Sequence, residues 1–278
     1  MPRLPPTERE HPRSKGLEAL PWRRLLALLH QGDLEAARAV GRALPALRRL
    51  CAEAVSALGA GGRIAYLGAG TSGRLGALDA AECPPTFGVS RGQVLALLAG
   101  GPRALAHAVE GAEDDRAAGR AAVRRARLGP ADLAVGVSAS GTTPFVLAGL
   151  EEALRRGARA GLITSNPRAR PPGVLRVVLA TGPELVQGST RLKAGTATKM
   201  ALSLFSTATM VRLGRVRDGR MIDLVPTNEK LRLRALRMVG ALSQVGPGRA
   251  LLALEASGWS VRQALERFGP PAARRGRR

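Results

Sequence analysis

Residues 63–88, RIAYLGAGTSGRLGALDAAECPPTFG, pass from a short apolar run into a glycine-rich turn and then into a helix-like segment. The apolar run predicts a buried strand. The closely spaced glycines allow backbone N–H groups at the start of the following helix to approach an anion. We therefore expect a strand, an anion-binding turn and a helix here, with Thr71 and Ser72 presenting hydroxyl groups suited to a phosphate monoester.

Four further apolar runs predict strands at 94–99, 132–138, 160–165 and 174–180. Helix-like segments such as 102–127 and 144–156 separate them, which is typical of βαβ units with a mostly parallel sheet. The fold class is therefore α/β, a three-layer sandwich with N-terminal helices and a small C-terminal helical region. The remaining expectations are an N-terminal arm and helices at 1–60, a main domain at 61–224 containing a long helix from Gly188 to about Leu213, and C-terminal helices with a basic tail at 225–278.

Two well-known nucleotide sites do not fit the first turn. A dinucleotide site needs an acidic residue after the second strand to bind ribose, and residues 84–101 contain none. A P-loop needs Lys-Ser or Lys-Thr where Arg74-Leu75 stand, so the phosphate lysine and the magnesium-ligating hydroxyl are missing. A phosphate monoester site remains, and the alternative is a tight turn in which Ser72 only caps the helix.

A second loop, VGVSASGTTP at 135–144, repeats the design of the first. It follows a predicted strand and places Ser138, Ser140 and Thr143 before a helix that Pro144 opens. Because the carboxyl ends of neighbouring parallel strands meet at one edge of a sheet, we expect both loops to bind one ligand.

Composition limits the other function classes. The 278 residues carry a net charge of +22, but the arginines are scattered over nearly every predicted helix and only 3% of residues are aromatic, so we expect no nucleic-acid partner. Two cysteines, Cys51 and Cys83, and three unclustered histidines indicate neither a disulfide framework nor a zinc site. No long apolar run predicts a membrane span, and the cytoplasm is the expected compartment.

Several long motifs resemble one family. GAGTSGRLGALDAAECPPTFG (68–88), AVEGAEDD (108–115), GPELVQGSTRLKAGTATKM (182–200) and MIDLVPTNEKL (221–231) stand in the order found in N-acetylmuramic acid 6-phosphate etherases. The two hydroxyl-rich loops resemble those of the sugar isomerase (SIS) domain, a phosphosugar-binding α/β sandwich. The likeness runs from about Thr7 to at least Leu231.

The resemblance implies a function and its residues. Etherases of this family cleave the lactyl ether of N-acetylmuramic acid 6-phosphate, giving N-acetylglucosamine 6-phosphate and D-lactate in cell-wall sugar recycling. They use no metal or organic cofactor and form homodimers. By resemblance Glu82 donates a proton and Glu113 is the second active-site residue, most simply the base. Substrate binding is expected from Thr71, Ser72, Ser138, Ser140, Thr143, Ser189 and Lys193.

Some assignments stay open at this point. Ser189 and Thr190 are as well suited to capping the long helix as to binding, and Lys193 is either a phosphate or carboxylate contact or an exposed lysine. The family often has arginine where Thr142 stands, which weakens the expected substrate contact there. Glu184 is a further acid that could assist ring opening, and the fallback acids are Asp79, Glu110, Asp114 and Asp115.

Two other functions remain as alternatives. A sugar-phosphate sensor without catalysis, as in the related glucokinase regulatory protein, needs the serine loops but not Glu82 and Glu113. A phosphosugar isomerase uses the same phosphate site with one base. The presence of both acids, and the sequence AECPPTFG at 81–88, favour the etherase.

Overall fold

The computed structural model describes residues 4–224 and 226–269. These divide into two compact units, one within Met1–Ala81 and Gly92–Thr209 and the other within Glu82–Arg91 and Met210–Arg278. The first unit contains the sheet and both hydroxyl-rich loops, and the second contains the C-terminal helices.

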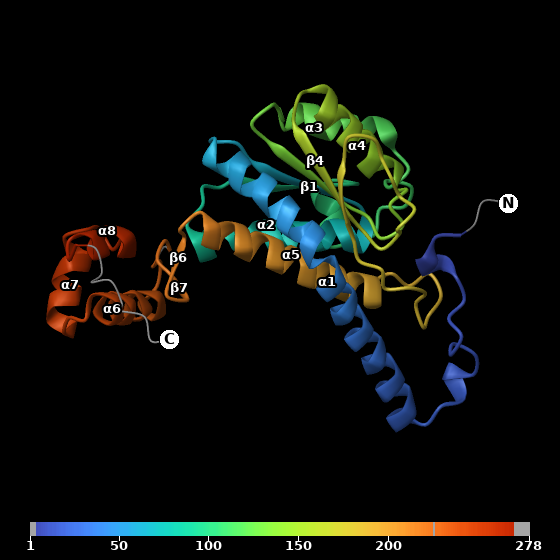
Figure 1. Cartoon of the computed structure of the whole chain (residues 1–278), viewed down its shortest axis with the longest axis horizontal. Coiled ribbons are helices and arrows are strands. Elements are labelled where there is room, and N and C mark those ends of the chain that lie inside the picture. The colour runs from blue at the N-terminus through green and yellow to red at the C-terminus, as the bar shows by residue number, and fades with distance from the viewer. Residues whose placement is uncertain (1–3, 225, 270–278) are drawn as a thin grey trace. The chain divides into compact units, whose positions relative to one another are not determined.

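The sheet of the first unit has five strands, all parallel, in the order β2-β1-β3-β4-β5 (Figure 1). Their bounds are β1 Ile64–Gly68, β2 Val94–Leu98, β3 Leu133–Val137, β4 Arg159–Thr164 and β5 Leu175–Val178. Every residue of β1 and of β3 is buried, as expected for strands that are covered on both faces. The five predicted strands are confirmed.

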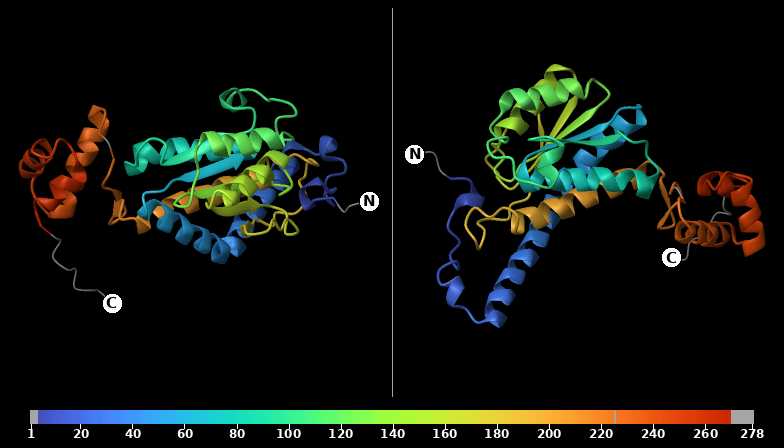
Figure 2. Two further views of the ribbon diagram at one scale, coloured as in Figure 1. Left: turned by 90° about the horizontal axis from the view of Figure 1, so that it is seen from above. Right: turned by 180° about the vertical axis from the view of Figure 1, so that it is seen from behind.

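Helices cover both faces of this sheet (Figures 1 and 2). On one face lie α3 (Arg116–Arg125) and α4 (Pro144–Arg155), which pack against Leu67 and its neighbours in a buried cluster. On the other face lie α1 (Trp22–Gly59), α2 (Gly70–Phe87) and α5 (Lys193–Arg212). There Tyr66 of β1 meets Phe205 of α5 edge-on, with ring centroids 6.2 Å apart. The predicted three-layer α/β class is confirmed.

Two helix boundaries differ from the prediction. The segment 102–127 is not one helix: a 3₁₀ turn, Pro102–Leu105, is followed by irregular chain, and α3 begins only at Arg116. Gly111 has φ of +71°, and the Asp115 side chain accepts a hydrogen bond from the backbone N–H of Ala118 at 2.7 Å, which fixes the start of α3. The long helix α5 likewise begins at Lys193 and not at Gly188.

Pro84 and Pro85 do not interrupt α2, which continues to Phe87. Neither proline has an N–H to donate to the carbonyl four residues earlier, but both lie in the last turn, so only the end of the helix loses these hydrogen bonds. Similarly, α1 passes through the exposed Pro45 and is a single helix of 38 residues. It follows an arm that contains two 3₁₀ turns, Pro6–Glu8 and Leu17–Ala19.

The second unit is built from a hairpin and three helices. These are β6 Val216–Arg217, β7 Arg220–Met221, α6 Glu229–Ser243, α7 Pro247–Glu255 and α8 Val261–Glu266. Met238, Leu254 and Leu265 lie in their shared core, which confirms the short helices predicted after residue 225. The predicted basic tail, 270–278, lies outside the described residues. Within the described part of the chain, no helix has the length and apolar character that crossing a bilayer requires.

Candidate active site

The first loop is shaped by close backbone contact. A Cβ on Gly68 would lie 2.6 Å from the Cα of Gly73, and one on Gly73 would lie 2.7 Å from the carbonyl carbon of Gly68, so both positions require glycine. This contact brings the end of β1 against the first turn of α2. Thr71 and Ser72 lie in that turn, both half-buried, where the helix N-terminus favours an anion. Ser72 is the third residue of α2 and therefore not its N-cap.

The second loop is held by its own hydroxyl groups. The Ser138 hydroxyl is buried, lies 2.7 Å from the Thr143 hydroxyl and accepts a hydrogen bond from the backbone N–H of Gly141 at 3.0 Å. The Ser140 hydroxyl accepts hydrogen bonds from the Thr142 backbone N–H at 3.2 Å and from its hydroxyl at 3.0 Å. Ser138 therefore orders the loop, while the half-buried Ser140 and Thr143 lie nearer its surface.

The sheet brings the two loops to one edge. β1 and β3 are hydrogen-bonded neighbours with Gly68 opposite Val137, so both loops leave the sheet at the same level. The connection from β1 leads to β2 on one side, whereas β4 and β5 follow on the other, and this reversal makes the crevice between β1 and β3 the usual ligand site of such folds. The two loops therefore lie at one edge of the sheet as expected, and their binding of one ligand stays a prediction.

Asn166 is a supporting residue that sequence reasoning missed. It follows β4, is 5% exposed, and its side-chain amide donates to the backbone carbonyl of Ser140 at 2.7 Å. Its backbone N–H in turn donates to the Thr164 hydroxyl at 3.1 Å. The sequence does contain a signal for this residue, because Asn166 directly follows the run AGLITS and so lies at the carboxyl end of the strand next to β3.

The start of α5 lies beside the first loop. A Cβ on Gly195 would touch the Thr71 methyl group at 3.6 Å. The cap of α5 is Glu184, which is fully buried and accepts hydrogen bonds from the backbone N–H groups of Lys193 at 3.0 Å and Ala194 at 2.9 Å. Burial raises the pKa of Glu184, against the opposing effect of these two bonds and of the Lys193 charge. Glu184, and not Ser189 or Thr190, therefore caps this helix.

Lys193 is neither exposed nor unpaired. Its side chain is buried, and its ammonium group lies 3.0 Å from a carboxylate oxygen of Glu35 on α1. Although burial alone would raise the pKa of Glu35, the hydrogen bond and charge of Lys193, together with Arg13, hold that pKa below its usual value. Burial, followed by the charges of Lys193 and Arg13, lowers the pKa of His11 in the same cluster. The exposed-lysine alternative is wrong, and contact between Lys193 and substrate stays a prediction.

Glu113 is anchored beside the second loop. It lies in the irregular segment before α3, and its backbone carbonyl accepts a hydrogen bond from the backbone N–H of Phe145 at 2.9 Å. Phe145 is in the first turn of α4, two residues after Thr143, while the carboxyl group of Glu113 is on an exposed residue. The structure therefore brings the backbone of Glu113 to the loop that carries Ser138 and Thr143.

Glu82 lies in the second unit, exposed, on the last part of α2. It follows Gly70 by twelve residues on one continuous helix, which corresponds to about 18 Å along the helix axis. Within a single α2, Glu82 is therefore remote from Thr71 and Ser72.

Two of the fallback acids make structural hydrogen bonds, and the other two are exposed. Asp79 accepts hydrogen bonds from the Tyr66 hydroxyl at 2.7 Å and the Ser206 hydroxyl at 2.9 Å, so it joins β1, α2 and α5. Asp115 caps α3. Glu110 and Asp114 are exposed in the same segment as Glu113. Among residues 4–224 and 226–269, no cluster of three or more metal-ligating side chains is found.

Comparison with known proteins agrees with this geometry. A family model described as the glucokinase regulatory protein N-terminal SIS domain matches residues 46–154. N-acetylmuramic acid 6-phosphate etherases of Serratia proteamaculans (strain 568) and Salmonella enteritidis PT4 are 43% and 44% identical to this chain over 261 residues, 93% of this chain and 88% of each relative. A solved Bacteroides fragilis structure, described as a phosphosugar isomerase involved in capsule formation, covers 70% of this chain and 94% of its own with a TM-score of 0.51 and 17% identity, and so shares the fold.

Proposed function

This chain belongs to the N-acetylmuramic acid 6-phosphate etherase family, and we propose that it cleaves the D-lactyl ether of N-acetylmuramic acid 6-phosphate. The products are N-acetylglucosamine 6-phosphate and D-lactate. The observation that carries the proposal is the pairing of two hydroxyl-rich loops at the β1–β3 crevice, in a chain 43–44% identical to etherases over nearly its full length.

The loops bind the phosphate of the substrate. Thr71, Ser72, Ser140 and Thr143 supply hydroxyl groups, and the N-terminus of α2 adds backbone N–H donors. Ser138 keeps the second loop in shape through the Gly141 N–H and the Thr143 hydroxyl. Binding the phosphate fixes one end of the open-chain sugar and so positions its C2–C3 bond.

Two carboxyl groups then carry the chemistry. In the open-chain form the C1 aldehyde acidifies the C2 proton, and Glu113 removes that proton as general base. The C3–O bond breaks, and Glu82 donates a proton to the departing lactate oxygen. Water adds at C3 of the resulting unsaturated aldehyde, which restores a hydroxyl group and gives N-acetylglucosamine 6-phosphate. Each positioned acid or base in such a step contributes about 10²–10⁴-fold in rate.

Oxygen-18 water tests this route. In elimination and addition, lactate keeps the ether oxygen and the sugar takes its new C3 oxygen from water. The label is therefore expected in N-acetylglucosamine 6-phosphate and absent from lactate, and in heavy water deuterium is expected at C2. Label in the lactate would instead mean attack on the lactyl carbon and would contradict the proposal.

We propose further that the chain works as a homodimer in which a second copy supplies Glu82. The length of α2 between Thr71 and Glu82 supports this, since eleven residues of one helix hold the two about 16 Å apart along its axis. Exposed apolar residues at the start of α1 offer surface for a second copy: Trp22 is 77% exposed and Leu26 is 58% exposed.

Mixing two inactive variants tests the shared site. If Glu113 and Glu82 of one site come from different copies, Glu82→Gln mixed with Glu113→Gln forms hybrid dimers with one intact site. Random exchange makes about half of the dimers hybrid, so about a quarter of the wild-type activity returns. If both acids come from one copy, the mixture stays inactive, and each variant alone is the matched control.

The sensor and isomerase alternatives make different predictions for the same substrate. A sensor binds N-acetylmuramic acid 6-phosphate without releasing lactate, and an isomerase yields a ketose phosphate. We place the reaction in the cytoplasm, in keeping with Cys51 and Cys83, which are not joined in a disulfide. No cofactor enters the proposed steps.

A further inference from the structure

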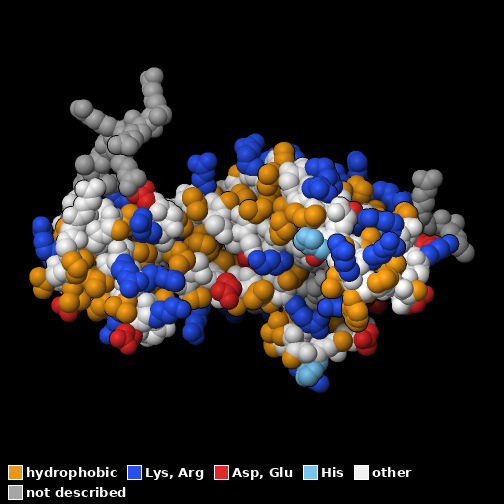
Figure 3. All heavy atoms as spheres, turned by 90° about the horizontal axis from the view of Figure 1, so that it is seen from below, with side chains coloured by type: hydrophobic (Ala, Val, Ile, Leu, Met, Phe, Trp, Pro, Cys, Tyr) orange, Lys and Arg blue, Asp and Glu red, His pale blue; other side chains and the backbone are white. Residues whose placement is uncertain are grey.

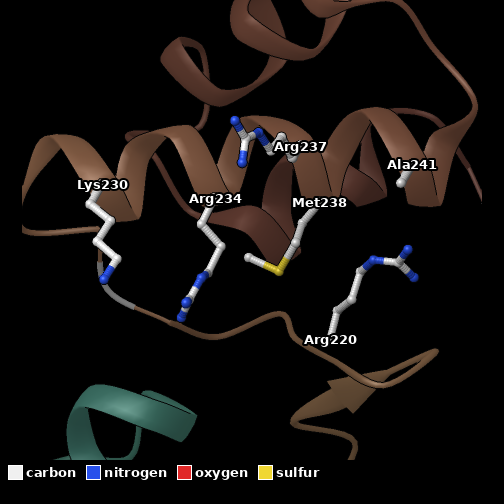
Figure 4. Close-up of a pocket in the computed structure, with 6 residues that line it drawn as sticks. All are labelled: Arg220, Lys230, Arg234, Arg237, Met238 and Ala241. Atoms are coloured by element: carbon white, nitrogen blue, oxygen red, sulfur yellow. The ribbon is translucent and has the colours of Figure 1, made fainter.

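The second unit contains a cavity that the proposed reaction does not use. Its volume is about 370 Å³, within the range of small-molecule sites. Figure 4 shows its lining from two elements, α6 and the hairpin strand β7. The lining residues are Arg220, Lys230, Arg234, Arg237, Met238 and Ala241.

The cationic side chains of this cavity lie around an apolar floor. Lys230, Arg234 and Arg237 follow one another at spacings of four and three, which places them along one side of α6. In Figure 4 Lys230 and Arg234 extend toward the same side, and the Met238 side chain lies between Arg234 and Arg220. Met238 is 6% exposed and belongs to the core of the unit, so the floor is rigidly held.

These cations differ from the second-unit arginines that have a carboxylate or aromatic partner. On the face seen in Figure 3, basic side chains are scattered among apolar ones, and most such charges are simply solvated. Several second-unit arginines have partners: Arg215 and Arg262 pair with Asp223 at 3.1 and 2.6 Å, and the Arg232 guanidinium lies 5.0 Å from the Trp259 ring centroid. Lys230 and Arg234, by contrast, form no ion pair with a carboxylate of the described residues.

The arrangement is unfavourable without an anion. Like charges four residues apart on a helix, such as Lys230 and Arg234, repel each other. Arg220 adds a third positive charge from the facing strand, and no acidic side chain lines the cavity. A dianion bound between them relieves this repulsion, and the planar guanidinium fork suits the oxygens of a phosphate group.

We propose that this cavity is a second anion site, which binds a small phosphate monoester. The phosphate lies between Arg220, Arg234 and Lys230, and the organic part packs on Met238 and Ala241. The site uses none of the residues of the β1–β3 loops, and the proposal does not depend on the etherase activity.

Hydrogen exchange of the full-length protein tests the proposal with glucose 6-phosphate as the probe. Slower exchange is expected in peptides that cover 216–241, with saturation at millimolar concentration or below. The double variant Arg220→Gln/Arg234→Gln is expected to raise the apparent Kd read from these peptides by about tenfold or more, since charge-assisted hydrogen bonds to the phosphate are lost. Arg234→Gln alone is expected to give a smaller increase, and it leaves the hairpin unchanged.

Arg267→Gln is the matched control, because Arg267 is exposed and lies in the same unit outside the cavity. It removes one charge and is expected to change the apparent Kd by less than about twofold. If Arg267→Gln raised the apparent Kd as much as Arg234→Gln does, the effect would be due to net charge, and the proposal would be overturned. Absence of protection at millimolar glucose 6-phosphate, or equal protection by unphosphorylated glucose, would also overturn it. The proposal would also be overturned if a short DNA duplex protected these peptides and glucose 6-phosphate did not, since that result would indicate a nucleic-acid surface.

Discussion

Replacing Glu184 by glutamine tests the cap of α5 most sharply. The Glu184 side chain is fully buried, and its two carboxylate oxygens accept hydrogen bonds from the backbone N–H groups of Lys193 at 3.0 Å and Ala194 at 2.9 Å. Glutamine keeps one acceptor, but its NH₂ group must face the other N–H, so one hydrogen bond is lost and one buried donor is left unpaired. Such a change costs about 2–4 kcal/mol of the free energy of unfolding.

Urea unfolding followed by far-UV circular dichroism measures this cost, and hydrogen exchange of the Ala194 amide locates it. The matched control is Glu151→Gln, since Glu151 is an exposed carboxylate that pairs with Arg116 and Arg120 on the surface. We expect that control to cost less than about 1 kcal/mol. If Glu184→Gln were no more costly than Glu151→Gln, or if the Ala194 amide kept its protection, the cap would not hold the start of α5.

Three further changes test other parts of the structure. Burial alone would raise the pKa of Asp132, but the hydrogen bonds that it accepts from Arg63 and from the Gly129 N–H lower that pKa. This carboxylate therefore stabilises the fold at pH values above its unfolded pKa, and the contribution is lost as the pH falls through the folded pKa. Asp132→Asn should flatten the acid side of a curve of unfolding free energy against pH. Ser140→Ala should raise the KM for phosphorylated substrate by about tenfold with little change in kcat, as measured by steady-state kinetics, and an unchanged KM would remove Ser140 from phosphate binding. Gly141→Ala should lower the free energy of unfolding by about 2–3 kcal/mol in urea, because Gly141 has φ of +67° and the added Cβ would lie 2.3 Å from that of Ala169; wild-type stability would contradict this.

Local patterns were enough to predict the sheet and its loops. The strands are short apolar runs, and the glycines at 68 and 73 mark a turn in which two backbone segments approach closely, so the sequence predicts the first loop at the end of β1. The loop 138–143 was found by the same reasoning, since its hydroxyl groups follow the neighbouring strand. These features depend on residues close together in the sequence.

The features that the sequence could not predict depend on distant partners. Lys193 is paired with Glu35, and Glu184 caps a helix from nine residues away, outside any local capping motif. The segment 102–127 is helix-like in sequence, but Gly111 adopts φ of +71° and Asp115 caps α3, so the chain before Arg116 is irregular. The continuous α2 also changes the role that Glu82 can have, since a helix of this length separates it from Thr71.

The most direct measurement of the central claim is the release of D-lactate from N-acetylmuramic acid 6-phosphate by the purified protein. We predict lactate and N-acetylglucosamine 6-phosphate in equal amounts, with release slowed about 10²–10⁴-fold by Glu113→Gln while substrate binding is retained. Binding of the substrate by the wild-type protein without any lactate, or undiminished release by Glu113→Gln, would contradict the account.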